Sequence, residues 1–238
     1  MLFSKEDLRK LIVPLVIEQL LAVTIGMADT MMVANVGEAA VSGISLVDSL
    51  NILLIQIFSA LATGGAVVSS QYLGRQDREN ACGAAKQLVY ACAAISILVG
   101  VLAMLGGKHL LSLIFGAVEP DVMRNAETYF WLSALSYPAL AIYNAGAALC
   151  RSMNRSRVTM IVSLIVNAVN IVGNALGVYV LHCGVEGVAV PTLVSRIVGA
   201  ACMLLYLRNT HLPLHLLHGR WKPDFPMMRE ILRIGVPN

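Results

Sequence analysis

Six long apolar segments alternate with short polar connections along almost the whole chain. Each segment reaches or exceeds the ~20 residues that a helix needs to cross a bilayer. Backbone polar groups in the hydrocarbon must be hydrogen-bonded within the protein, and continuous apolar runs of this length predict helices instead of alternating barrel strands. We therefore predict an all-α membrane protein, with six transmembrane helices at residues 11–34, 41–72, 82–106, 126–149, 158–181 and 186–207.

Composition and charge support this class and add an orientation. The chain is 58% hydrophobic and 13% charged, with a mean hydropathy of +0.75. Alternating the six spans puts 14 of the 17 Lys and Arg residues on the side that holds the N-terminus, leaving Lys108 and Arg124 opposite and Arg196 within a span. Basic residues favour the cytoplasmic side, so we expect a multi-pass protein of the plasma (inner) membrane with a cytoplasmic N-terminus.

The C-terminal part differs from the six-span region 1–207. Residues 208–228 carry three prolines and three histidines, which predicts a cytoplasmic interfacial linker. Residues 231–237 resemble residues 8–14, because both place a basic residue four positions before a proline. We interpret 229–238 as the truncated start of a second repeat and expect a second six-helix lobe. The intact mass of the natural protein would test this expectation. Repeated halves are the usual build of secondary transporters.

Two carboxylates fall within the first span. Asp29 follows Glu18 by eleven residues, about three helical turns, so the two side chains share one helix face. Ionisable residues at membrane depth usually face the bundle interior and mark an ion or substrate path. The alternatives are that Asp29 is hydrated near the outer end of its span and that Glu18 has a structural role.

A polar stripe runs along one face of the fifth span. Ser163, Asn167, Asn170 and Asn174 follow one another at intervals of four, three and four residues. Several amides in register favour a cavity lining or ligands for a hard cation, since amide oxygens can coordinate one. Interhelical hydrogen bonding is the alternative reading.

Other intramembrane polar residues extend this set of candidates. Thr192 follows Pro191, where a kink frees backbone carbonyls, and Arg196 lies one turn further on. Arg196 either pairs with Asp29 or Glu18, or extends towards an interface. Asn144 could line a cavity from the fourth span. We expect Asp48 to lie near the outer surface.

Several other function classes lack support. The chain has no phosphate-binding loop, no pattern of nucleophile and base, and no basic and aromatic surface of the kind that binds nucleic acid. We therefore predict that the protein is not an enzyme, has no resident cofactor and has no structural metal. Its five cysteines are expected to be free thiols, and the histidines of the linker are expected to be solvated.

Four stretches together resemble the multidrug and toxic compound extrusion (MATE) family. They are similar to the aspartate motif of that family's first helix, its loop between the second and third helices, its fifth-helix motif and the entry to its sixth helix. The stretches are Met27–Val33, Ser70–Asp77, Asn170–Asn174 and Gly184–Thr192.

The resemblance implies one lobe, the N-terminal one, of a twelve-helix, two-lobed transporter. It further implies export of cationic or amphiphilic drugs and toxic compounds, driven by inward flow of H⁺ or Na⁺. The family's cation site would then correspond to Asp29, Asn170, Asn174 and Thr192, although some members have Asp where this chain has Asn174. The alternatives are a lipid-linked oligosaccharide flippase of the same superfamily and an inactive membrane fragment.

Overall fold

The computed structural model describes residues 5–116, 118–216 and 224–235, and every regular element in these ranges is helical. Six long helices and one short helix follow one another, and a π-helical turn, η1, extends α5. Their bounds are α1 Lys5–Ala34, α2 Glu38–Gly74, α3 Arg78–Phe115, α4 Pro120–Ser152, α5 Ser156–Ala175, η1 Leu176–Val180, α6 Glu186–Leu207 and α7 Phe225–Gly235.

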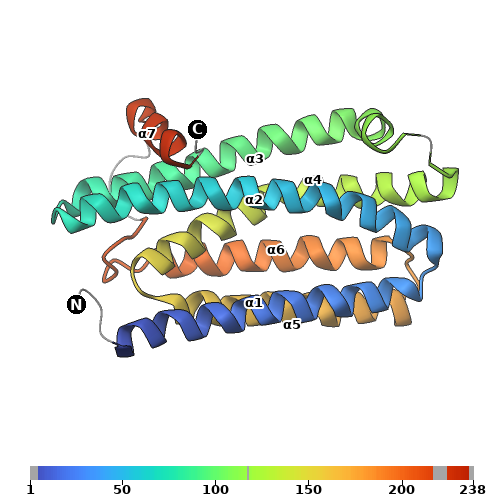
Figure 1. Cartoon of the computed structure of the whole chain (residues 1–238), viewed down its shortest axis with the longest axis horizontal. Coiled ribbons are helices and arrows are strands. Elements are labelled where there is room, and N and C mark those ends of the chain that lie inside the picture. The colour runs from blue at the N-terminus through green and yellow to red at the C-terminus, as the bar shows by residue number, and fades with distance from the viewer. Residues whose placement is uncertain (1–4, 117, 217–223, 236–238) are drawn as a thin grey trace.

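The six long helices form one antiparallel bundle in which consecutive helices run in opposite directions (Figure 1). By length and composition, α2, α3, α6 and the continuous helix Ser156–Val180 are apolar enough to cross a membrane. The 30 residues of α1 and the 33 residues of α4 also exceed the length of a crossing, and polar side chains lower the hydropathy of α4. The predicted all-helical fold is confirmed, and most of the helices extend beyond the predicted spans.

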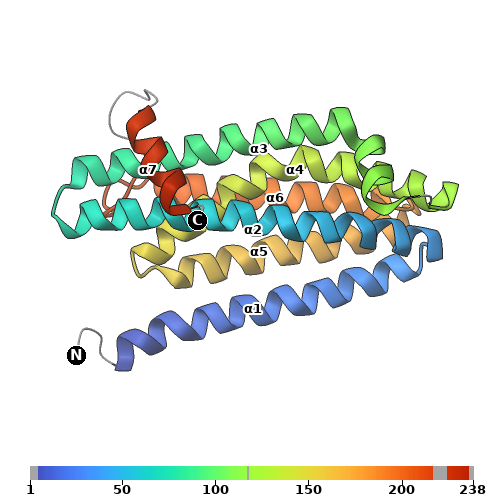
Figure 2. The ribbon, with the colours of Figure 1, turned by 45° about the horizontal axis from the view of Figure 1, so that its top comes forward.

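Helix α4 lies at the centre of the bundle, packed against α2, α3 and α6. Tyr137 of α4 is fully buried, and its ring centroid lies 6.2 Å from that of Phe58 on α2. By contrast, α1 packs mainly against α5, has few contacts with α2, and forms the outer edge of the bundle in the turned view (Figure 2). Among the six long helices, the helix at the edge is thus held mainly by a single neighbour, α5.

Small residues set the spacing between α5 and α6. A Cβ atom added to Gly173 would meet Pro191 at 2.6 Å, and one added to Gly177 would overlap the backbone of Gly187. Side chains this small let membrane helices approach closely. Gly173 and Gly177 therefore serve helix packing, directly beside the polar stripe.

The described part of the linker packs into the lobe, whereas the sequence suggested a connector along the membrane surface. Leu212, Leu214 and Leu216 are buried, and the Arg78 guanidinium donates hydrogen bonds to the carbonyls of Thr210 and Leu212 at 2.9 and 2.8 Å. His215 is also buried, with its Nδ1 3.4 Å from the Sγ of Cys82, so the expectation of solvated histidines is wrong for His215.

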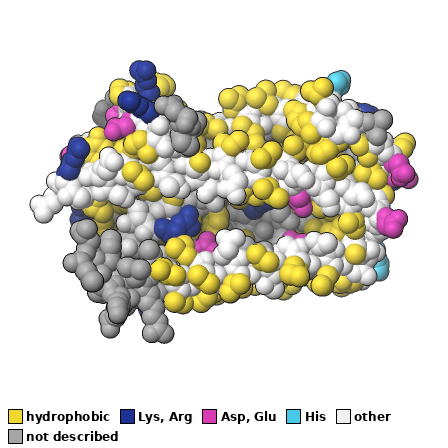
Figure 3. Space-filling view, in the orientation of Figure 1, with side chains coloured by type: hydrophobic (Ala, Val, Ile, Leu, Met, Phe, Trp, Pro, Cys, Tyr) yellow, Lys and Arg dark blue, Asp and Glu magenta, His cyan; other side chains and the backbone are white. Residues whose placement is uncertain are grey.

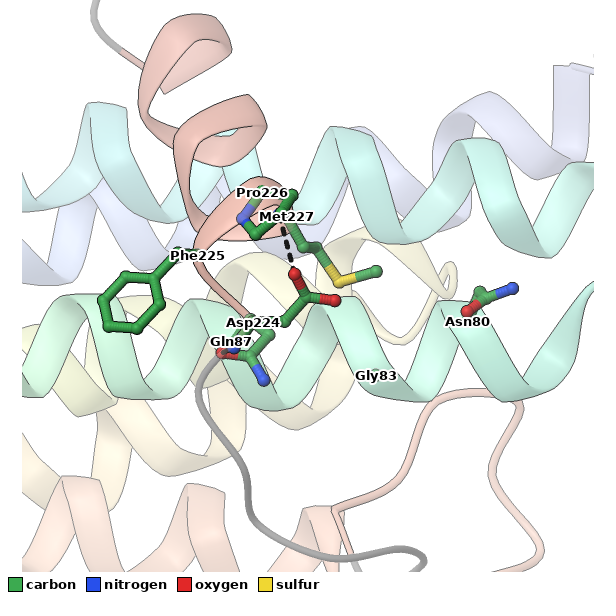
Figure 4. A pocket seen from close by; sticks show the side chains of 7 residues that line it. All are labelled: Asn80, Gly83, Gln87, Asp224, Phe225, Pro226 and Met227. Carbon is green, nitrogen blue, oxygen red and sulfur yellow. Dashed lines mark hydrogen bonds between the residues drawn. The ribbon is translucent and has the colours of Figure 1, made fainter.

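Helix α7 begins at Phe225, inside the range predicted for the linker, and docks on α2 and α3. Asp224 starts the helix: its Oδ1 accepts from the N–H of Met227 at 3.2 Å, and its own N–H donates to Oε1 of Gln87 at 3.1 Å. Figure 4 shows these groups around a shallow cleft of about 460 Å³ between α7 and α3. The buried side chain of Ile231 fixes the other face of α7.

Candidate functional site

The four predicted cation-site residues come together between α1, α5 and α6. Nδ2 of Asn174 donates to Oδ1 of Asp29 at 2.6 Å and to Oδ1 of Asn170 at 3.2 Å. Nδ2 of Asn170 donates to Oγ1 of Thr192 at 3.1 Å, and the Thr192 hydroxyl donates to the carbonyl of Val188 at 2.9 Å. Three helices are thus joined by one chain of hydrogen bonds that ends at the Asp29 carboxylate.

The arrangement leaves one buried acceptor without a donor. Asn174 is fully buried, and its Oδ1 has no hydrogen-bond partner among the described residues. Leaving a buried polar atom unpaired costs about 1–3 kcal/mol. An amide oxygen beside a carboxylate can ligate a hard cation, which would satisfy both groups.

Asp29 also lines a cavity of about 90 Å³ between α1, α2, α4 and α6. Asp48 of α2 and Tyr129 of α4 line the same cavity, and its remaining walls are small or apolar. In the space-filling view, acidic and basic side chains lie along a furrow between α1 and α2, between more hydrophobic rims (Figure 3). The lining residues are Gly26, Asp29, Thr30, Val33, Val41, Ile44, Ser45, Asp48, Tyr129 and Val188.

Asp48 belongs to a second polar network, between α2 and α4, that sequence reasoning missed. Its Oδ1 accepts from the hydroxyl of Tyr129 at 3.2 Å and from Nδ2 of Asn51 at 3.3 Å. The hydroxyl of Tyr137 donates to Oδ1 of Asn51 at 2.9 Å. Asp48, which we expected near the outer surface, is half-buried and hydrogen-bonded in this network. Its three-residue spacing from Asn51 on one helix face was the signal that could have pointed to the network.

Arg196 contacts neither of the carboxylates proposed as its partners. Its Nη1 donates to Oγ of Ser136 on α4 at 2.6 Å, and the carboxylate with which its guanidinium interacts electrostatically is Asp48. The predicted pairing with Asp29 or Glu18 is therefore wrong among the contacts of the described residues. Arg196 turns towards α4 because α6 packs on that helix.

Glu18 has separate partners towards the end of the bundle that holds the start of α1. Its Oε1 lies 3.7 Å from Nη1 of Arg151, and its Oε2 accepts from the Thr159 hydroxyl at 3.2 Å. Both carboxylates of α1 face inward, as predicted, but they have different partners: Asp29 contacts Asn174, whereas Glu18 contacts Arg151 and Thr159. Glu18 ties α1 to the ends of α4 and α5.

The other two candidates lie outside the Asp29 network. Nδ2 of Asn167 is 3.4 Å from Oγ of Ser163, within α5. Nδ2 of Asn144 is buried and has no hydrogen-bond partner among the described residues. The described residues also contain no group of three or more His, Cys, Asp or Glu side chains that could hold a metal ion.

Comparison with known proteins identifies the family. Residues 14–176 match the protein-family model MatE, which covers more than half of the chain. The chain belongs to the MatE family. The resemblance seen in the four sequence stretches is thereby confirmed, and the protein is a multi-pass membrane protein of a multidrug efflux transporter family.

Curated MatE relatives match nearly all of this chain. The chain is 28% identical over 94% of its length to the "Uncharacterized transporter YisQ" of Bacillus subtilis. It is 27% identical over 98% of its length to the "Probable multidrug resistance protein NorM" of Thermotoga maritima. The chain spans about half the length of these relatives, 50% in both cases.

Solved transporter structures share the fold. A MOP superfamily transporter from Pyrococcus furiosus, described as having a binding pocket of reverse polarity, matches the fold with a TM-score of 0.89 at 18% identity. The match covers 97% of this chain and 51% of that transporter. A multidrug resistance MATE family transporter in its outward-facing conformation gives a TM-score of 0.87 at 20% identity, and the match covers 97% of this chain and 51% of that one. The six-helix bundle is therefore one lobe of this fold.

Proposed function

We propose that the protein works in a cation-coupled antiporter that exports cationic or amphiphilic drugs and toxic compounds, with H⁺ or Na⁺ as the coupling ion. The observation that carries the proposal is the hydrogen-bonded chain from Thr192 through Asn170 and Asn174 to Asp29. The partly buried carboxylate of Asp29 lies against neutral groups that can either bind a metal cation or accommodate a protonated acid.

The network suggests how ion binding could change the lobe. An ionised Asp29 accepts strongly from Asn174, because hydrogen bonds to charged acceptors are shorter and stronger than neutral ones. A proton or Na⁺ on Asp29 weakens that bond and loosens the contact between α1 and α5. Since α1 has few contacts with α2, this edge helix is free to move, and we expect it to bend near Gly26. The ion then shifts the population between two conformations through its different affinity for each.

The distribution of basic residues supports the proposed orientation. Arg75, Arg151, Arg155 and Arg208 lie at the connections and helix ends that share one end of the bundle with the start of α1 (Figure 1). Lys108 and Arg124 lie towards the opposite end. Basic residues favour the cytoplasmic side, so we propose the plasma membrane, a cytoplasmic N-terminus and efflux towards the Lys108 end.

The relatives' length supports a second six-helix unit as the partner of this lobe. Because the chain matches about half of each relative, we propose that two such units enclose the path of the exported compound. The bilayer and a small organic cation complete the expected partners.

Ethidium efflux from cells that make the protein tests the proposal through Asp29→Asn. We expect this variant to lose the efflux driven by an imposed ion gradient, because the neutral amide can no longer exchange charge with the coupling ion. Asp121→Asn is the matched control, since Asp121 is exposed and pairs with Arg124 outside the bundle. Gradient-driven efflux that is equal in the two variants and the wild type would contradict the proposed coupling role.

A further inference from the structure

The cavity between Asp29 and Asp48 has the size of a small ion with little water. Its volume is about 90 Å³, whereas one water occupies about 30 Å³ of the liquid. Pockets for drug-sized ligands have volumes of roughly 300–1,000 Å³. The cavity therefore excludes a drug molecule in this conformation and accommodates a partly hydrated monovalent cation.

Asp48 is held firmly at the wall of this cavity. Tyr129 and Asn51 both donate to its Oδ1, and the Tyr137 hydroxyl fixes Asn51 in turn. These groups surround one carboxylate oxygen with donors from two helices. Such pre-positioning is what a binding group needs if a cation is to replace its water without a further rearrangement.

The net charge around the cavity favours the binding of one monovalent cation. Asp29 and Asp48 interact electrostatically across it, and Asp48 also interacts with Arg196. Two carboxylates and one guanidinium leave a single negative charge. Arg196 is engaged by Ser136, so it does not enter between the carboxylates.

We propose that Asp48 is a second carboxylate of the coupling-ion site, and that the ion occupies the cavity shared by Asp29 and Asp48. This inference rests on the proposed function and adds a residue on α2 to a site otherwise built from α1, α5 and α6. Binding an ion there links α1 directly to α2, with which it otherwise has few contacts.

Ion binding to the purified protein in lipid nanodiscs tests the inference. Radioactive sodium is titrated in one set of samples, and proton uptake from weakly buffered solution is measured in another, so the wild type shows which ion binds. Asp48→Asn keeps an acceptor for Tyr129 and Asn51. It should weaken binding of that ion by about tenfold or more, as expected for loss of a close charge interaction. Asp48→Glu, which keeps the charge, should bind more tightly than Asp48→Asn, and Asp121→Asn should match the wild type.

The double variant separates one site from two. If both carboxylates hold the same ion, Asp29→Asn combined with Asp48→Asn should cost less than the sum of the single effects. Wild-type affinity in Asp48→Asn together with lost binding in Asp29→Asn would overturn the role of Asp48 and leave the proposed function intact. Unchanged binding in Asp29→Asn as well, or no ion binding by the wild type, would overturn both.

Discussion

Replacing Gly177 by alanine should force α5 and α6 apart and destabilise the lobe. A Cβ atom at Gly177 would lie 2.7 Å from Cα and 2.8 Å from the carbonyl carbon of Gly187, and still closer to its oxygen. Ordinary contacts at a Cβ atom begin near 3.4 Å. The obstructing atoms are backbone, so a whole helix must shift, and overpacking of this kind typically costs about 1–3 kcal/mol.

The matched control is Gly83→Ala on α3. A Cβ atom at Gly83 would meet nothing within 4 Å, and the residue lies inside a helix. Here alanine should stabilise by about 0.5–1 kcal/mol, because it restricts the unfolded chain and favours the helix. The same chemical change should therefore move stability in opposite directions at the two positions.

Thermal unfolding of detergent-purified variants, followed by intrinsic fluorescence at one heating rate, measures both changes. A shift of about 2–4 °C per kcal/mol applies to chains of this size. Gly177→Ala should thus melt about 2–12 °C below the wild type, and Gly83→Ala about 1–4 °C above it. A Gly177→Ala protein that melts at or above the wild-type temperature would refute the argument from close approach.

A double-mutant cycle tests whether Gly177 and Gly187 share one contact. Gly187→Ala should also destabilise, since its added Cβ would lie 2.8 Å from the carbonyl carbon of Gly177. One displacement of α5 from α6 would accommodate both alanines, so the double variant should cost less than the sum of the single variants. Strict additivity would show that the two positions act independently.

Two further predictions concern single polar groups. Tyr137→Phe removes the donor to Oδ1 of Asn51 and should cost about 1–3 kcal/mol, because it leaves a buried acceptor unpaired; equal melting temperatures of variant and wild type would contradict this. Hydrogen bonds from the side chain and backbone of Asn80 hold the pKa of Asp77 below its ordinary value. The ionised Asp77 carboxylate therefore stabilises the fold fully above the ordinary pKa, and this stabilisation is lost as the pH falls through the lowered pKa. Asp77→Ala should therefore lower the melting temperature at neutral pH and converge with the wild type in acid, whereas a pH-independent difference would rule out the carboxylate as the cause.

The sequence by itself determined the helices, the family and the composition of the Asp29 site. Apolar runs of membrane length can satisfy their backbone only as helices, so the class followed from the pattern. The spacing of Asn170 and Asn174 put both amides on one face of α5 without knowledge of any neighbour. The resemblance of short stretches to a known family then pointed to Asp29 and Thr192 as their companions, and the structure brings these four residues together.

Only the tertiary structure decided which polar groups meet across helices. Periodicity places a side chain on a face of its own helix, but its partner depends on how the helices are rotated and how closely they approach. That is why Arg196 reaches Ser136, why Glu18 reaches Arg151, and why Asp48 lines a cavity with Asp29. The pairing of a buried charge follows from this packing, which the order of residues within one helix does not contain.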